Sequence, residues 1–144
     1  MEIKIHEGFP DIEVIIKCPE ATDEIKKMVS LLQETNQKLT GMKDGQIHLI
    51  DKQDVLYFES VDKRCFIYTA ADVYETSLKL YEIEELLSDA PFIRSSKSQI
   101  LNIMKITSLC PEFGSRLEAV LQNGEKLIVS RQYSKSLKER LGLG

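Results

Sequence analysis

The chain has 144 residues and a mass of 16.5 kDa, which predicts one compact domain or one domain with a small appendage. Hydrophobic residues make up 42% of it and charged residues 29%, and no apolar run reaches the roughly 18 residues that a transmembrane helix needs. The beginning of the chain lacks the basic and apolar regions of a secretory signal. Its three widely spaced cysteines argue against a disulfide framework, so we expect a protein of the reducing cytoplasm.

The net charge of −4 conceals two parts of opposite sign. Residues 1–90 hold 10 Lys and Arg against 19 Asp and Glu, a balance of −9, whereas residues 91–144 hold 9 against 4, a balance of +5. Such asymmetry is typical of a localised surface that binds a polyanion, and it is equally typical of basic residues that decorate a C-terminal helix and solvated strand edges. Charge alone therefore leaves both interpretations open.

The first 45 residues are predicted to form a small β/α segment. Residues 3–5 and 12–16 alternate apolar and polar side chains with the period of a half-buried strand. Thr22 is the predicted N-cap of a helix, and Gly41 and Gly45 are expected to break the chain after it. The helix carries one apolar stripe, made of Ile25, Met28, Val29 and Leu32. This stripe serves either as core packing or as a dimer face.

The rest of the chain is predicted to be mostly β, with two short helices. Strands are expected over residues 47–50, 55–58, 64–69, 73–77, 92–94, 117–121 and 127–129, and an apolar run covers 100–106. One helix is expected over 80–87, ended by Pro91, and another over 134–141, followed by Gly142. Asn123-Gly124 predicts a hairpin with a type I′ turn, whose two central residues both need a positive φ.

The chain lacks the residue patterns of the common catalytic and metal sites. Neither His6 nor His48 has a ligand neighbour three or four residues away, and the cysteines are too far apart for a zinc site. The scattered glycines form no phosphate-binding loop. Buried Cys65 and Cys110 are expected to act as small apolar side chains. We therefore predict neither an enzyme nor a cofactor.

Three polar or basic clusters are expected on loops next to strands. They are Asp62-Lys63-Arg64, Ser95-Ser96-Lys97-Ser98-Gln99 and Ser130-Arg131-Gln132-Tyr133-Ser134. Each cluster combines a cation for phosphate or guanine with short polar side chains that reach base edges or backbone oxygens. Three such loops on a β-rich scaffold favour a nucleic-acid partner.

Three stretches in particular resemble a known family. They read DVLYFES (Asp54–Ser60), FIRSSKSQILN (Phe92–Asn102) and LQNGEKLIVSR (Leu121–Arg131). Their order and spacing are similar to those of the LytTR DNA-binding domain of bacterial transcription regulators. The resemblance runs from about residue 46 to 142 and implies a mainly β, α+β fold. It implies an elongated set of small antiparallel sheets, in which loops enter successive major grooves of DNA.

The resemblance also implies which residues contact the DNA. The first family contact falls on Lys63 and Arg64, and the third on Arg131 with Gln132 beside it. The second falls on the stretch that holds Arg94, Ser96, Lys97 and Ser98. Lys97 stands where the family has Arg, and a point charge favours contact with the DNA backbone over base reading. Ser96 stands where His is usual, so this chain lacks a ring that stacks or donates there.

We thus expect residues 1–45 to form an input or dimerisation segment and residues 46–144 to form the DNA-binding domain. The leading segment is too short for a receiver domain, so the chain resembles the stand-alone LytTR type. That type implies promoter DNA, a homodimer and a small membrane protein as partners. An alternative interpretation is a protein-interaction or ligand-sensing module whose basic surface is incidental.

Overall fold

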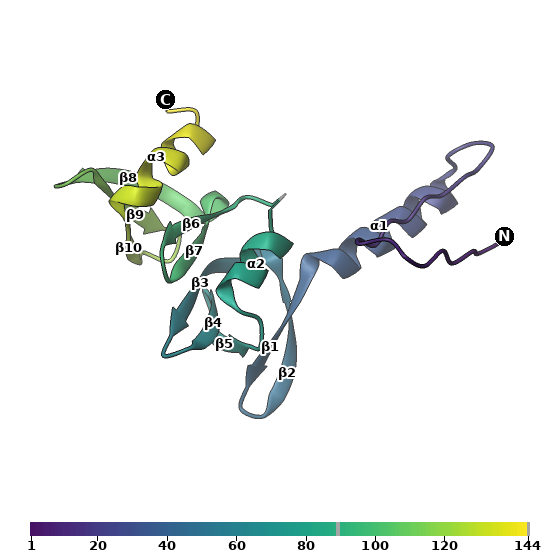
Figure 1. Cartoon of the computed structure of the whole chain (residues 1–144), viewed down its shortest axis with the longest axis horizontal. Coiled ribbons are helices and arrows are strands. Elements are labelled where there is room, and N and C mark those ends of the chain that lie inside the picture. Colours follow the sequence, from purple (N-terminus) through teal and green to yellow (C-terminus); the bar gives the residue numbers. More distant parts are fainter. Residues whose placement is uncertain (89, 144) are drawn as a thin grey trace. The chain divides into compact units, whose positions relative to one another are not determined.

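The computed structural model describes residues 1–88 and 90–143, without the side chains of residues 33–37. The chain divides into two compact units, Met1–Asn36 and Gln37–Gly144 (Figure 1). Among the described residues no helix is long and apolar enough to cross a membrane.

The first unit holds helix α1 (Asp23–Gln37) and the residues that precede it. The helix begins where predicted, and the Oγ1 atom of Thr22 accepts a hydrogen bond of 3.4 Å from the backbone N–H of Ile25. The strands predicted over 3–5 and 12–16 are wrong, because residues 1–22 join no sheet. An alternating pattern makes a strand only where another strand satisfies its backbone groups. None of the described strands pairs with these residues, and Ile12 is 98% exposed.

The second unit contains a sheet of seven strands, each antiparallel to its neighbours. Its order is β2-β1-β5-β4-β3-β7-β6, so β3 lies near the centre and β2 and β6 are the edges. The strands are β1 (Lys38–Lys43), β2 (Gln46–Asp51), β3 (Val55–Val61), β4 (Arg64–Thr69), β5 (Val73–Thr76), β6 (Phe92–Ser96) and β7 (Gln99–Asn102). A short 3₁₀ turn, Lys52–Asp54, joins β2 to β3.

The sequence predicts a break at Gly41 and Gly45; it occurs at Gly45, in the β1–β2 turn, but the prediction is wrong for Gly41, which lies inside strand β1. Gly41 lies inside the strand because the core leaves no room for a larger residue: a Cβ atom there would lie 2.6 Å from the Cβ of Tyr74. Gly45 follows Asp44 in the β1–β2 turn, where both have a positive φ, 76° and 51°. This is the type I′ pattern, whose twist matches that of the two strands.

Three further strands form a second antiparallel sheet in the order β10-β9-β8. They are β8 (Ile106–Glu112), β9 (Arg116–Leu121) and β10 (Lys126–Val129), and a 3₁₀ turn over Ile103–Lys105 precedes them. The predicted β9–β10 hairpin is confirmed, but its turn is not type I′. Only Gly124 has a positive φ, and the Leu121 N–H donates to the Glu125 carbonyl, which closes a three-residue loop.

Two helices complete the second unit. Helix α2 (Leu80–Leu86) ends before Pro91, as predicted, and α3 (Arg131–Arg140) begins three residues earlier than predicted. Gly142 has a φ of 73°, and its N–H donates to the Glu139 carbonyl at 3.1 Å. This is the glycine-capped helix end that the sequence indicates.

The core consists of two apolar clusters on opposite faces of β3. One contains Val55 and Phe58 and includes the buried side of α2, and the other contains Leu56 and Tyr57 and includes Leu137 of α3. The first four residues of β3 are therefore buried on both faces of the strand, whereas the last three, which lead to the turn, are partly buried or exposed. Cys65 is buried as predicted, whereas Cys110 is exposed, contrary to the prediction.

Candidate nucleic-acid interface

Two backbone hydrogen bonds bring the three predicted loops together. The β6–β7 turn lies between the other two loops: the Ser98 carbonyl accepts from the Ser60 N–H, and the Ser95 carbonyl accepts from the Ser130 N–H, both at 2.8 Å. Ser60 lies two residues before the β3–β4 turn, and Ser130 immediately precedes Arg131 at the start of α3. We call the β3–β4 turn, the β6–β7 turn and the first turn of α3 the loop surface.

Lys63 is the exposed tip of the β3–β4 turn. Asp62 and Lys63 have φ values of 51° and 67°, the left-handed pair of a type I′ turn. Such a conformation costs a residue with a side chain about 1–2 kcal/mol, and glycine adopts it freely. The hydrogen bonds and ion pairs among the described residues leave the Lys63 ammonium without a partner. The turn therefore presents a free cation on a strained backbone.

Arg64, the next residue, is engaged within the protein. Its guanidinium donates to both carboxylate oxygens of Glu75, at 3.0 and 2.5 Å, and lies 5.3 Å from the centre of the Phe66 ring. The hydrogen bond to Glu75 raises the pKa of Arg64 and lowers the pKa of Glu75. Arg64 must therefore leave or share this carboxylate to reach a DNA phosphate.

Arg94 is also engaged, and it shapes the central turn. Its Nη1 donates to the Lys97 carbonyl at 2.7 Å, its Nε donates to Glu84 of α2 at 3.0 Å, and its side chain is only 17% exposed. Ser96 acts locally too, because its Oγ accepts from the Ser98 N–H at 3.2 Å. These bonds fix the turn and leave the Lys97 side chain pointing to solvent as an exposed, unpaired cation among the described residues.

Arg131 is the first residue of α3, and both it and Gln132 are exposed. The helix is fastened to the β8–β9 turn by Ser134, whose Oγ donates to the Ser115 carbonyl at 2.7 Å. The sequence did not indicate this contact. The Arg131 side chain has no hydrogen-bond partner in the described part of the chain and is available to a ligand.

The structure adds residues that the sequence did not single out. Under the loop surface, the carboxylate of Glu59 accepts from Gln99 Nε2 at 2.6 Å and from the Tyr68 hydroxyl at 3.3 Å. Burial, together with this carboxylate, raises the pKa of Tyr68. Lys135, one turn after Arg131, is a further exposed cation on α3. The links to Glu59 depend on cross-strand register, for which an unaligned sequence carries no direct signal.

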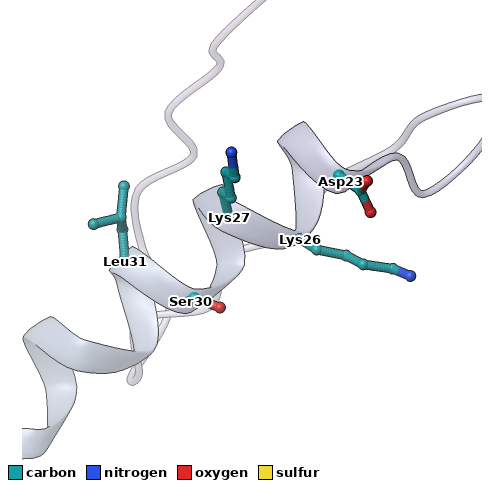
Figure 2. Close-up of a pocket in the computed structure, with 5 residues that line it drawn as sticks. All are labelled: Asp23, Lys26, Lys27, Ser30 and Leu31. Atoms are coloured by element: carbon teal, nitrogen blue, oxygen red, sulfur yellow. The ribbon is translucent and has the colours of Figure 1, made fainter.

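A shallow pocket also lies along one side of α1, in the first unit (Figure 2). The ammonium groups of Lys26 and Lys27 point in different directions, so they do not converge on a common ligand position. The residues that the structure describes include no group of three His, Cys, Asp or Glu placed to hold a metal ion. The loop surface is therefore the better candidate site.

The family model of the LytTr DNA-binding domain matches residues 45–142 of this chain. The chain belongs to the LytTR family. Its strand arrangement resembles the solved LytTr DNA-binding domain of a protein described as a methyl-accepting/DNA response regulator from Bacillus cereus. That match has a TM-score of 0.70 and 26% identity over 74% of this chain and 97% of the other. The mainly β, α+β fold expected from the sequence is thus confirmed.

Two relatives from Staphylococcus aureus are similar over most of this LytTR chain. Both are named uncharacterized HTH-type transcriptional regulators. The one from strain NCTC 8325 / PS 47 is 32% identical over 89% of this chain and 88% of its own length. The one from strain MRSA252 is 31% identical over the same shares. In the second unit, five strands separate α2 from α3, so these two helices do not form a helix-turn-helix.

The extent of the family match differs slightly from that of the compact unit. The match begins at residue 45, whereas the compact unit begins at Gln37 and its sheet includes β1. The predicted division into residues 1–45 and 46–144 stays a prediction.

Proposed function

We propose that this LytTR protein is a sequence-specific transcriptional regulator of the bacterial cytoplasm that binds promoter DNA through the loop surface. Family membership supports DNA as the partner. The observation that carries the proposal is the pair of backbone hydrogen bonds that join the three loops. They gather Lys63, Lys97 and Arg131, whose side chains are exposed and unpaired among the described residues. Clustered cations of this kind neutralise phosphates.

The individual roles follow from the chemistry of each side chain. Arg131 is proposed to read guanine, because a planar guanidinium donates two parallel hydrogen bonds to the O6 and N7 atoms of that base. Lys63 and Lys97 are point charges suited to phosphate, with Arg64 as a secondary contact. Arg94 positions the turn that carries Lys97.

The smaller polar side chains of the loop surface have supporting roles. Ser98 and Gln132 are proposed to donate to phosphate oxygens or base edges, because both are exposed. Ser96 is half-buried and already accepts a hydrogen bond from the following turn residues, so it is proposed to act next to the contact rather than at its centre.

We also propose that the protein acts as a homodimer on repeated sites. Small regulators gain affinity and specificity by joining two recognition surfaces, each of which reads one half-site. The small membrane protein implied as a signalling partner stays a prediction from the family resemblance.

The test is a fluorescence-anisotropy titration of the full chain at two salt concentrations. One DNA is the region upstream of its own gene, and the other is a shuffled sequence of equal length. Arg131→Ala should cost about 1–3 kcal/mol on the specific DNA and relax the preference at one base pair. Lys97→Ala should weaken both complexes alike and reduce the salt slope by about 1. Lys17→Ala, outside the family-matched region, is the control.

Equal losses on both DNAs for Arg131→Ala would refute its role in base reading. An unchanged salt slope for Lys97→Ala would refute its contact with phosphate. If the native protein prefers neither DNA at either salt concentration, the interaction-module interpretation replaces the regulator.

A further inference from the structure

The two edges of the seven-stranded sheet differ in how they are protected. At the β6 edge, the Ser95 carbonyl accepts from the Ser130 N–H, and α3 packs against the strand. At the other edge, β2 pairs with β1 on one side and with no other strand of the described chain. An open edge presents a row of backbone donors and acceptors that a further strand can pair with.

The β1–β2 turn determines which backbone groups of β2 face outward. Asp44-Gly45 is a two-residue type I′ turn, so Lys43 and Gln46 form its hydrogen-bonded closing pair. Directly opposed residues alternate between bonded and non-bonded pairs along an antiparallel ladder. Ile47 and Leu49, which oppose Met42 and Thr40, are therefore in non-bonded pairs. Their N–H and C=O groups point to the open edge.

The side chains of this hairpin are apolar on both of its faces. Leu39 and Ile50 lie in the core on one face. On the other face, Met42, Ile47 and Leu49 are 46%, 71% and 68% exposed. Natural edge strands are usually protected by lysine, proline, a bulge or a covering segment. Strand β2 contains no lysine or proline, and its register with β1 is unbroken.

We propose that a second copy of this chain pairs with β2 and extends the sheet across a twofold axis centred on His48. This register places Ile47 opposite Leu49 of the partner subunit. The outward backbone groups of these two residues then bond each other, and their side chains continue the apolar face. Because twofold symmetry repeats the contact, the same pairing occurs twice. The same register brings Lys52 near Asp44 of the partner subunit, and these two side chains have opposite charges.

This register is the reason why we propose a second copy of the chain, and not another protein, as the partner of β2. An antiparallel copy places the exposed apolar side chains of Ile47 and Leu49 against each other, and it places the opposite charges of Lys52 and Asp44, each four residues from His48, at the same ends. The inference names the surface of the dimer proposed above and does not depend on the DNA contacts.

Sedimentation velocity of the full chain without DNA, over a range of protein concentrations, tests the pairing. The native protein should dimerise. Leu49→Pro removes an outward N–H without disturbing the pairing of β2 with β1, and Ile47→Lys places a charge in the apolar face. Both should weaken dimerisation at least about tenfold, with circular dichroism and the thermal midpoint confirming the fold. Val73→Lys is the control: it changes an equally apolar, 45% exposed residue on the interior strand β5.

A native protein that stays monomeric at every concentration would overturn the proposal, as would Leu49→Pro and Ile47→Lys variants that dimerise normally. If instead the double variant Ile12→Lys/Val14→Lys becomes monomeric while both β2 variants stay dimeric, the N-terminal segment forms the interface and the proposal is wrong. A titration of each variant on a DNA with a single half-site distinguishes a loss of dimerisation from a loss of DNA binding. A monomeric variant should still bind it.

Discussion

Replacing Lys63 with glycine is expected to make the protein more stable and its complex with DNA weaker. Lys63 has a φ of 67°, where a side chain costs about 1–2 kcal/mol. Glycine removes that cost but gives the unfolded chain more freedom, which offsets about 0.5–1 kcal/mol. The net gain in the free energy of unfolding is therefore about 0.5–1 kcal/mol. For a chain of this size it raises the melting temperature by about 2–4 °C.

The same change removes one ammonium group from the loop surface. If that group neutralises a phosphate, the slope of log affinity against log salt falls by about 0.9. Urea unfolding gives the stability change, and anisotropy titrations at several salt concentrations give the slope. Lys63→Ala is the matched control, because it removes the charge and retains the left-handed backbone. It should reproduce the loss of affinity, with a stability within about 0.5 kcal/mol of the native protein.

Two results would contradict this reasoning, one concerning the strain of the turn and the other concerning the contact with DNA. If Lys63→Gly is no more stable than Lys63→Ala, the turn does not hold Lys63 in a strained conformation. If both variants keep the native affinity and salt slope, Lys63 does not contact the DNA, whatever the state of its backbone. If the reasoning is right, Lys63→Gly is more stable than Lys63→Ala, and both variants bind DNA more weakly than the native protein.

Two further predictions concern the core that supports the loop surface. Gly41→Ala should cost about 1–3 kcal/mol in urea unfolding, because the new Cβ would lie 2.6 Å from the Cβ of Tyr74; a loss under about 0.5 kcal/mol would show that the strand shifts freely. Burial and the hydrogen bond to Glu125 raise the pKa of Tyr57. The neutral Tyr57 hydroxyl therefore contributes fully to stability below the ordinary tyrosine pKa of about 10, and this contribution is lost as the pH rises above that value. Tyr57→Phe should therefore flatten the loss of stability between about pH 10 and pH 12, and an unchanged pH profile would contradict the assignment.

The strands of the second unit were largely predictable because their pattern and their packing agree. Residues 64–69 were predicted as a strand, and β4 has these bounds with Cys65 and Ile67 buried on one face. Residues 3–5 and 12–16 alternate apolar and polar side chains, a pattern that also predicts a strand, yet they form none. The difference lies in the partner: β4 pairs with β3 and β5, and a single sequence does not show which segments find one another.

The prediction missed strand β1 for the opposite reason. Glycine weakens an isolated strand, so Gly41 argued against one. In the folded chain the requirement is steric: the position faces Tyr74 and Ile50, and only a residue without a side chain fits. The β9–β10 turn was also misjudged in detail, because Asn-Gly suits both a two-residue loop and the three-residue loop that is present.

The candidate site was predicted as a set of loops but not as an arrangement. The polar clusters and the family resemblance pointed to the loops, but the hydrogen bonds that join them through Ser60 and Ser130 link segments far apart in the sequence, which a single sequence does not show. The engagement of Arg64 and Arg94 was invisible for the same reason. The carboxylate partner of Arg64 lies eleven residues away and that of Arg94 ten residues away, each on a different element, and no helical or strand period connects them.

The division of the sequence into an acidic and a basic part does not coincide with the loop surface, which takes cations from both parts. Lys63 belongs to the acidic part of the chain and Arg131 to the basic part, yet both lie on the loop surface. The acidic part also supplies the carboxylates that hold Arg64 and Arg94, so two of the five cations predicted to bind DNA are neutralised before DNA arrives. Each neutralised cation removes one potential phosphate contact and so lowers sequence-independent affinity. A surface with few free charges binds random DNA weakly, and its discrimination must then come from base contacts such as the one proposed for Arg131.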